Sequence, residues 1–273
     1  MDDLVRDDYL SLDELRLHYR EWGDITAPPL VLLHGFTGHA RSWDSFARAM
    51  SRRYRVLALD QRGHGESGWT TDYSTPAMVG DLRAFVRALC LEHFDLLGLS
   101  MGGSVAYHYA GSRPPELDRL VIVDIGPELV ASGSQRIQSG VQAADTFDSV
   151  EAAIAGGRAG NARADEDEMR HRVRHNLMRT VDGRWTFRYD KALRSPGRPR
   201  PRPSSAENWA AWKQINVPTL LLRGGVSDIL ALETAERMAK EIPDCRLIEI
   251  PGSGHSIPLE APVRFLEAVQ TFL

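Results

Sequence analysis

Short apolar runs recur along the chain, and segments with helical spacing separate most of them. The runs are rich in Val, Leu and Ile, and they span residues 30–33, 56–59, 96–99, 120–123, 219–222 and 247–250. Continuous apolar runs of this length are typical of strands that are buried on both faces of a parallel sheet. An early segment, 14–22, alternates apolar and polar residues, which predicts a strand with one more exposed face.

The segments between these runs carry apolar residues at helical intervals. The clearest predicted helices span residues 43–52, 76–90, 101–112, 233–241 and 262–273. Strands that alternate with helices imply right-handed crossovers and a doubly wound sheet with helices on both faces. The predicted fold class is therefore α/β.

The alternation stops between residues 123 and 219. This interval shows helical patterns at 141–155 and 166–178, but no run of the core-strand type. It also contains an Arg- and Pro-rich segment, 195–205, in which the prolines exclude both a helix and a central strand. We therefore predict a helical insertion at 127–212, lying over a core formed by 1–126 and 213–273.

The strongest local signal is Gly98-Leu-Ser100-Met-Gly102, which follows an apolar run and opens the predicted helix 101–112. This is the context of a nucleophile elbow, a sharp strand-to-helix turn that exposes a serine hydroxyl. Glycines suit such a turn because a side chain at either position would collide with the neighbouring strand or helix. We predict that Ser100 is a nucleophile rather than part of a merely structural turn.

A serine hydroxyl needs a base to take its proton, and the base needs an acid that orients it. His255 lies on a Gly-rich loop directly after the last predicted strand, and Asp228 follows the strand before it. The chain order Ser100, Asp228, His255 is the order expected after a nucleophile elbow. Because parallel strands place ligands at their carboxyl ends, we expect all three side chains at one edge of the sheet.

Asp124 is the alternative acid, because it ends the run 120–123 and reaches the same edge. We favour Asp228, since the chain-order rule puts the acid after a later strand. Asp124 is instead expected to line the substrate pocket or to end its strand in a turn.

A loop with the sequence His34-Gly35-Phe36-Thr37-Gly38 follows the predicted strand 30–33. Such a loop can offer a backbone N–H, here that of Phe36, to pair with the N–H of Met101 as an oxyanion hole. The Phe36 ring is expected to form an apolar wall of the substrate pocket. His34 is expected to brace the loop by hydrogen bonds rather than to take part in the chemistry.

These motifs together resemble the ordered signature of the α/β-hydrolase superfamily. They are His34-Gly35-Phe36, Asp60-Gln-Arg-Gly-His-Gly-Glu-Ser67, Gly98-Leu-Ser-Met-Gly102, Asp228 and Gly254-His255. The resemblance covers residues 10–126 and 213–273 and is to the branch of small-molecule esterases, lactonases and carbon–carbon bond hydrolases. It implies a mostly parallel eight-stranded sheet with a helical cap after the sixth strand. Ser100 differs from the Asp that haloalkane dehalogenases and epoxide hydrolases carry at the nucleophile position.

Composition disfavours several other classes of protein. The formal net charge of the 273 residues is −4, whereas nucleic-acid-binding domains are usually basic. The two cysteines, Cys90 and Cys245, form no C-x-x-C pair, so neither a disulfide framework nor a zinc ribbon is indicated. The sequence shows no secretory signal and no apolar stretch of membrane-spanning length. We expect a cytoplasmic protein with neither nucleic-acid nor membrane partners.

Two further sequence patterns resemble binding motifs but lack the flanking residues that such motifs need. Gly63-His-Gly65-Glu-Ser-Gly68 fits a dinucleotide-binding pattern, but a loop follows it rather than a helix. His171 and His175 are four residues apart, but the arginines around them would repel a metal cation. We therefore expect no cofactor and no metal.

The expected function is hydrolysis of a small, fairly apolar carboxylic ester through an acyl-enzyme on Ser100, with His255 as base. A carbon–carbon bond hydrolase of a diketone, or an enol-lactonase, would use the same residues with a different pocket. A small-molecule receptor without catalytic activity is the alternative of another class, although a receptor has no need of three catalytic roles.

Overall fold

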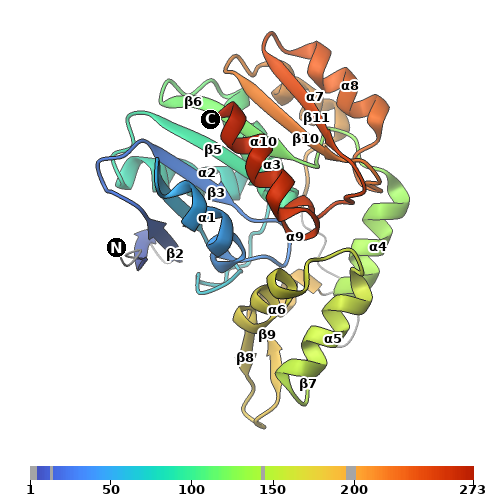
Figure 1. Ribbon diagram of the computed structural model, residues 1–273. Coiled ribbons are helices and arrows are strands. Elements are labelled where there is room, and N and C mark those ends of the chain that lie inside the picture. Colours follow the sequence, from blue (N-terminus) through green and yellow to red (C-terminus); the bar gives the residue numbers. More distant parts are fainter. Residues whose placement is uncertain (1–4, 13–14, 143–144, 195–200) are drawn as a thin grey trace.

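The computed structural model describes residues 5–12, 15–142, 145–194 and 201–273. Its main sheet has eight strands in the order β1-β2-β4-β3-β5-β6-β10-β11 (Figure 1). The strands are β1 (Arg6–Leu12), β2 (Leu15–Trp22), β3 (Pro29–Leu33), β4 (Arg55–Leu59), β5 (Phe94–Leu99), β6 (Leu117–Val123), β10 (Thr219–Gly224) and β11 (Cys245–Ile250). In this order, each strand from β4 to β11 is parallel to its neighbour. The strand β2 is antiparallel to both β1 and β4. The predicted α/β class and mostly parallel sheet are confirmed.

Successive residues of the central strands enter two separate apolar cores. Leu30 and Leu32 pack in the core beneath α1 (Asp44–Met50) and α10 (Pro262–Phe272). Val31 and Leu33 pack in the opposite core, which four further helices cover. These are α2 (Thr75–Ala88), α3 (Met101–Gly111), α7 (Ser205–Lys213) and α8 (Leu232–Glu241). Because both faces are covered, the strands read as continuous apolar runs rather than as an alternating pattern.

The chain between β6 and β10 departs from the helical insertion that the sequence predicts. It contains α4 (Ala131–Gln142), α5 (Val150–Gly160), α6 (Glu166–His175) and the short helix η2 (Lys191–Arg194). It also contains a three-stranded antiparallel sheet in the order β7 (Thr146–Phe147), β9 (Trp185–Phe187), β8 (Leu177–Arg179). Most of it forms a separate lobe at one end of the main sheet (Figure 1). Strands of two or three residues are too short to produce a readable periodicity.

Two helices predicted in this segment have different bounds in the structure. The helix predicted at 141–155 is wrong, because α4 ends at Gln142 and α5 begins only at Val150, where the Ser149 side chain accepts the N–H of Ala152. The helix predicted at 166–178 ends at His175. Part of the Arg- and Pro-rich segment, 195–200, lies outside the described residues.

The helix α7 falls inside the predicted insertion, yet it packs on the main body. It contacts α3, and Trp209 and Trp212 are buried in the larger of the two apolar cores. The Trp212 indole N–H donates to the carbonyl oxygen of Met238 in α8, at 2.9 Å. The lobe visible in Figure 1 therefore comprises α5, α6 and the strands β7, β8 and β9. In the described part of the chain, no helix has the length and apolar character needed to cross a membrane.

Candidate active site

Ser100 occupies the turn between β5 and α3 in a backbone conformation that is rare for a residue with a side chain. Its φ is 53° and its ψ is −114°. A Cβ atom on Gly98 would lie 2.4 Å from the carbonyl oxygen of Gly102, and one on Gly102 would lie 2.4 Å from that of Leu33. Both glycines are therefore required by backbone that passes directly beside them, as the sequence predicts.

His255 joins Ser100 to a buried carboxylate. It follows β11, and its Nε2 atom lies 2.9 Å from the Ser100 Oγ. Its Nδ1 atom lies 2.8 Å from the Oδ2 of Asp124, the residue that directly follows β6. Asp124 is fully buried and also accepts the backbone N–H of Gly224 at 2.8 Å and the hydroxyl of Ser227 at 2.5 Å. Its carboxylate is thus held in one orientation, facing His255.

The predicted pairing of His255 with Asp228 is wrong. The Asp228 carboxylate faces α4, where Arg136 binds it through two contacts of 2.6 and 2.8 Å. These hydrogen bonds from Arg136 hold the pKa of Asp228 below its usual range. The side chain that this turn presents to the site is that of Ser227, which donates to Asp124 and accepts the N–H groups of Ile229 and Leu230. Asp124, considered above as the alternative acid, occupies the place predicted for Asp228.

The loop after β3 lies against the serine. A Cβ atom added to Gly35 would stand 3.3 Å from the Cβ of Ser100, so this loop passes at van der Waals distance. Phe36 lines the same pocket as Ser100, and Met101 is the first residue of α3. Phe36 and Met101, whose backbone N–H groups are predicted to form an oxyanion hole, therefore both line the pocket at Ser100.

His34 holds this loop in place by hydrogen bonds, as expected. Its Nδ1 atom lies 2.8 Å from the carbonyl oxygen of Gly35, and its Nε2 accepts the backbone N–H of Gln61 at 3.0 Å. Burial lowers the pKa of His34 and so favours the neutral ring, which has one donor and one acceptor for these two contacts. His34 does not contact Ser100, which agrees with a structural role.

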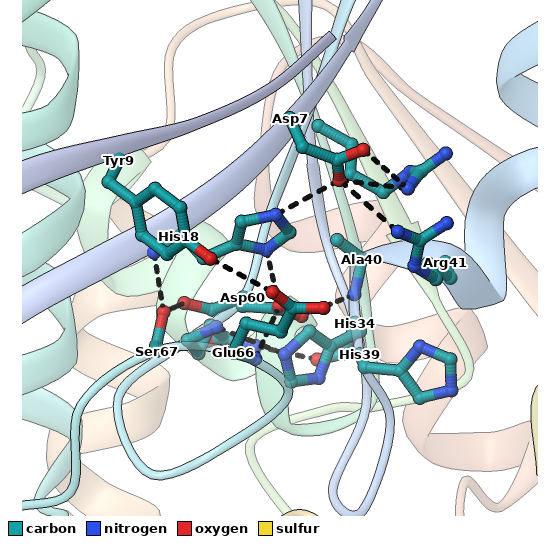
Figure 2. Close-up of polar contacts among 12 residues, drawn as sticks. Asp7, Tyr9, His18, His34, His39, Ala40, Arg41, Asp60, Glu66 and Ser67 are labelled. Atoms are coloured by element: carbon teal, nitrogen blue, oxygen red, sulfur yellow. Dashed lines mark hydrogen bonds and ion pairs between the residues drawn. The ribbon is translucent and has the colours of Figure 1, made fainter. Parts of the chain in front are cut away.

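Asp60 forms hydrogen bonds with several segments of the chain, as Figure 2 shows. Its carboxylate accepts the backbone N–H of Ala40 at 2.5 Å and that of Glu66 at 2.9 Å, and it lies 2.6 Å from the His18 Nδ1. A Cβ atom on Gly65 would lie 2.2 Å from this carboxylate. A Cβ atom on Gly63 would likewise lie 2.4 Å from the Tyr73 ring, so close packing explains two glycines of the pattern that resembled a dinucleotide motif. The sequence placed Asp60 in a family motif but did not reveal this bracing role.

The helix α6 is hydrogen-bonded to the main body beside the catalytic loop. The Asn176 side chain, at its end, donates to the carbonyl oxygen of Thr37 at 2.9 Å. The His39 Nε2 lies 2.9 Å from the carbonyl oxygen of Arg172, and the His171 Nε2 lies 3.0 Å from the Asp44 carboxylate. The contact with Asp44 raises the pKa of His171 and so favours an ion pair between the two side chains. Within the described residues, no group of three or more His, Cys, Asp or Glu side chains could hold a metal ion.

A pocket of about 200 Å³ opens at Ser100. Most of its wall is hydrocarbon, and the apolar side chains are Phe36, Met78, Met101, Ile125, Leu129 and Ile229, joined by the rings of Tyr73 and Tyr107. Asp124, expected to line the pocket if it was not the acid, is instead buried behind His255. The site therefore combines a serine, an imidazole and a carboxylate in hydrogen-bonded series with a small, largely apolar chamber.

The chain matches the α/β hydrolase fold family over residues 28–262. It is 30% identical to the 3-hydroxybutyrate-oligomer hydrolase of Cupriavidus necator over 272 residues, which cover 94% of this chain and 92% of that protein. It is also 30% identical over 266 residues to an esterase of Mycobacterium tuberculosis, with 92% and 84% of the two chains covered.

Solved structures agree with this assignment. A crystal structure of an esterase from Mycobacterium tuberculosis matches with a TM-score of 0.79 at 26% identity and covers 98% of this chain and 90% of that one. The crystal structure of E-2-(acetamidomethylene)succinate hydrolase has a TM-score of 0.88 at 22% identity, with 98% and 99% covered, and this likeness shows the fold alone. The chain belongs to the α/β-hydrolase family and is a hydrolase of that fold.

Proposed function

We propose that this protein hydrolyses small, fairly apolar carboxylic esters through an acyl-enzyme on Ser100. The observation that carries the proposal is the hydrogen-bonded series from Ser100 through His255 to Asp124 at a largely apolar pocket. The relatives from Cupriavidus necator and Mycobacterium tuberculosis, named as an oligomer hydrolase and an esterase, support the choice of an ester.

In the first half of the reaction, the Ser100 oxygen attacks the ester carbonyl carbon while His255 Nε2 takes the hydroxyl proton. Asp124 accepts the other ring N–H and stabilises the imidazolium. When the tetrahedral intermediate collapses, the bond from the acyl carbon to the alcohol oxygen breaks. His255 gives its proton to the leaving alcohol, and the acyl group remains on Ser100.

In the second half, water replaces the alcohol. His255 takes a proton from the water as its oxygen adds to the acyl carbon. The bond to Ser100 then breaks, and His255 returns the proton to the serine oxygen. The products are one carboxylic acid and one alcohol, and the residues return to their starting protonation states.

The negative charge that develops on the carbonyl oxygen needs hydrogen-bond donors. We assign this role to the backbone N–H groups of Phe36 and Met101, because both residues line the pocket at Ser100. Met101 also opens α3, and the amino end of a helix favours negative charge. Loss of one such donor typically costs about 3 kcal/mol of transition-state stabilisation.

We assign the role of a cap to the segment between β6 and α7. Leu129, Arg202 and Pro203 from this segment contribute to the pocket wall. A cap of this kind excludes water from the reacting ester and selects the substrate by shape. The small volume of the pocket favours short acyl or alcohol groups.

The test is turnover of a series of p-nitrophenyl esters of increasing acyl length. We expect the Ser100→Ala variant to lose at least about ten-thousand-fold in kcat. Ser112→Ala is a matched control, because Ser112 follows the same helix at its far end and its hydroxyl donates only to a carbonyl of that helix. Circular dichroism and thermal melting confirm that all variants fold.

Labelling supplies a second readout that does not depend on the substrate. A fluorophosphonate should modify the wild type at Ser100, as located by peptide mass spectrometry, and should leave the Ser100→Ala protein unmodified. Retention of ester turnover by folded Ser100→Ala would contradict the proposal. Binding of esters by the folded wild type without any product would favour the receptor alternative.

A further inference from the structure

The catalytic pocket has an uneven distribution of charge. Among the described residues that line it, Arg202 alone carries a formal charge, and the other polar contributions come from hydroxyl and amide groups. A cationic group in a mostly apolar chamber strongly favours ligands that present a negative charge to it.

Arg202 is held near the serine by the start of α7. Ser204, two residues later, accepts the N–H of Glu207, and Glu207 in turn accepts the N–H of Ser204 at 2.7 Å. The Asn208 side chain donates to the carbonyl oxygen of Pro203 at 3.4 Å. Since α7 packs on α3, the helix that begins beside Ser100, the backbone around Arg202 is tied to the element that carries the nucleophile.

Three acidic side chains of neighbouring segments have partners other than Arg202. Glu128 accepts the indole N–H of Trp209 at 2.7 Å, and Glu207 closes the capping box of α7. Asp228 is paired with Arg136. Within the described part of the chain, no carboxylate lies within ion-pair distance of Arg202, unlike Arg136, Arg194 and Arg223, which each have one.

Arg202 is an exposed residue, so the surrounding protein desolvates its guanidinium only in part. Desolvation lowers the pKa of Arg202, although a guanidinium keeps its charge at neutral pH. A partly desolvated cation without a counter-ion is energetically unfavourable, and an anionic ligand would remove that penalty. Arg202 is therefore available at the pocket wall to pair with a negative group on a ligand.

We propose that Arg202 recognises a carboxylate on the substrate, so that the preferred substrates are esters with an apolar linker between the scissile bond and a terminal carboxylate. This inference rests on the proposed ester hydrolysis and names the substrate class for that site. The apolar side chains that line the pocket together with Ser100 and Arg202 suit the linker, and the planar guanidinium suits two parallel hydrogen bonds to a carboxylate. The carboxylate can belong to the acyl part or to the alcohol part of the ester, and substrate pairs distinguish these two cases.

The test compares esters that differ only in charge. Mono-p-nitrophenyl adipate carries the carboxylate on the acyl side and is compared with p-nitrophenyl hexanoate. The compound 4-carboxyphenyl hexanoate carries it on the alcohol side and is compared with phenyl hexanoate. Rates without enzyme are subtracted. We expect the wild type to have the higher kcat/KM for the anionic member of one pair. In Arg202→Gln the ratio of anionic to neutral kcat/KM should fall about tenfold or more, mainly through KM.

Two variants separate recognition of the carboxylate from general effects. Arg202→Lys should keep part of the preference, because the charge remains while the planar fork is lost. Arg246→Gln removes an exposed arginine on β11 and should leave the ratio unchanged. Rising ionic strength should raise KM for the anionic ester in the wild type more than in Arg202→Gln. An anionic-to-neutral ratio that is the same in the wild type and Arg202→Gln for both pairs would overturn the inference.

Binding distinguishes a failure of this inference from a failure of the proposed function. Calorimetric titration of adipate monomethyl ester and of 4-carboxyphenyl hexanoate into Ser100→Ala and into Ser100→Ala/Arg202→Gln needs no turnover. Weaker binding of either ligand by the double variant supports carboxylate recognition even if no ester is hydrolysed. Equal affinity of the two proteins for both ligands, or no binding of either ligand, overturns it even if neutral esters are hydrolysed by the wild type.

Discussion

His255 Nδ1 lies 2.8 Å from the Asp124 carboxylate, which reaches the histidine from the end of β6 rather than from the end of β10. The two strands are parallel neighbours, and Val123 pairs with Leu222, so both strand ends open at the same edge beside the loop after β11. An acid after either strand is therefore within reach of the histidine. The hydrogen bonds of Ser227 and Gly224 to Asp124 decide between them, because they aim that carboxylate at the ring.

The first prediction concerns this choice of acid. Asp124→Asn should lower kcat about ten-thousand-fold with little change in KM, because an amide can hold the wrong tautomer of His255. Asp228→Asn should change kcat by no more than a few-fold and stability by less than about 1 kcal/mol, because its partly exposed ion pair with Arg136 contributes little. Steady-state kinetics on both variants measures these two effects on kcat. The reverse order of effects would restore Asp228 as the catalytic acid.

The second prediction concerns the hydrogen bond from the Asn176 side chain to the Thr37 carbonyl. Thr37 has a φ of 62° and follows Phe36, so this contact holds a strained residue beside the proposed oxyanion hole. Asn176→Ala should lower kcat about tenfold with KM nearly unchanged, because small displacements of catalytic groups are costly. Arg174→Ala, an exposed change on the same helix, is the matched control. A lower melting temperature with unchanged kcat would show that Asn176 is merely structural.

The contrast between Ser100 and Asp124 shows what sequence can and cannot predict here. Ser100 was predictable because the glycines on both sides are forced by backbone contact, which leaves a fixed local pattern. The acid was not predictable, because Asp124 and Asp228 both follow strands that end at one edge and only side-chain direction separates them. The central strands were predictable from burial on both faces. The strand β1 was missed because most of its residues are exposed, and β7 to β9 were missed because they are too short.

The third prediction compares two glycines. Gly102→Ala should destabilise the protein by about 3 kcal/mol and abolish activity, because its Cβ would press on the backbone of Leu33 at the serine turn. Gly80→Ala should stabilise it by about 0.5–1 kcal/mol, because Gly80 lies within α2 and its Cβ would meet no atom within 4 Å. Thermal melting and ester turnover measure both effects. Similar melting temperatures for the two variants would contradict the close approach that defines the turn.

The fourth prediction concerns the dependence of stability on pH and the buried pair of His18 and Asp60. The two ring nitrogens of His18 lie 2.6 Å from Asp60 and 3.0 Å from Asp7, so both face carboxylates and the ring is suited to the doubly protonated form (Figure 2). Burial opposes this charge, but the hydrogen bond and charge of Asp60 outweigh it and raise the pKa of His18. Despite its own burial, the pKa of Asp60 lies below the usual range, chiefly because of the hydrogen bond from His18.

The signs of the two shifts define a window of maximum stability. A raised pKa means that the contribution of His18 is complete below its unfolded value, about 6.5, and is lost as pH rises through the folded value. A lowered pKa means that the contribution of Asp60 is complete above its unfolded value, about 3.9, and is lost as pH falls through the folded value. The pair should therefore stabilise the protein most between about pH 4 and 6.5.

Replacing His18 by Gln removes the titrating ring but retains a polar side chain. We expect a loss of about 1.5–3 kcal/mol within that window, because hydrogen bonds to charged groups have this range. The difference in unfolding free energy between the wild type and His18→Gln should shrink as pH rises through the folded pKa of His18. Urea denaturation from pH 5 to pH 9 measures the difference, with His93→Gln as control, because His93 is largely exposed. A difference that stays constant across this range would show that the His18 ring is not charged in the folded protein.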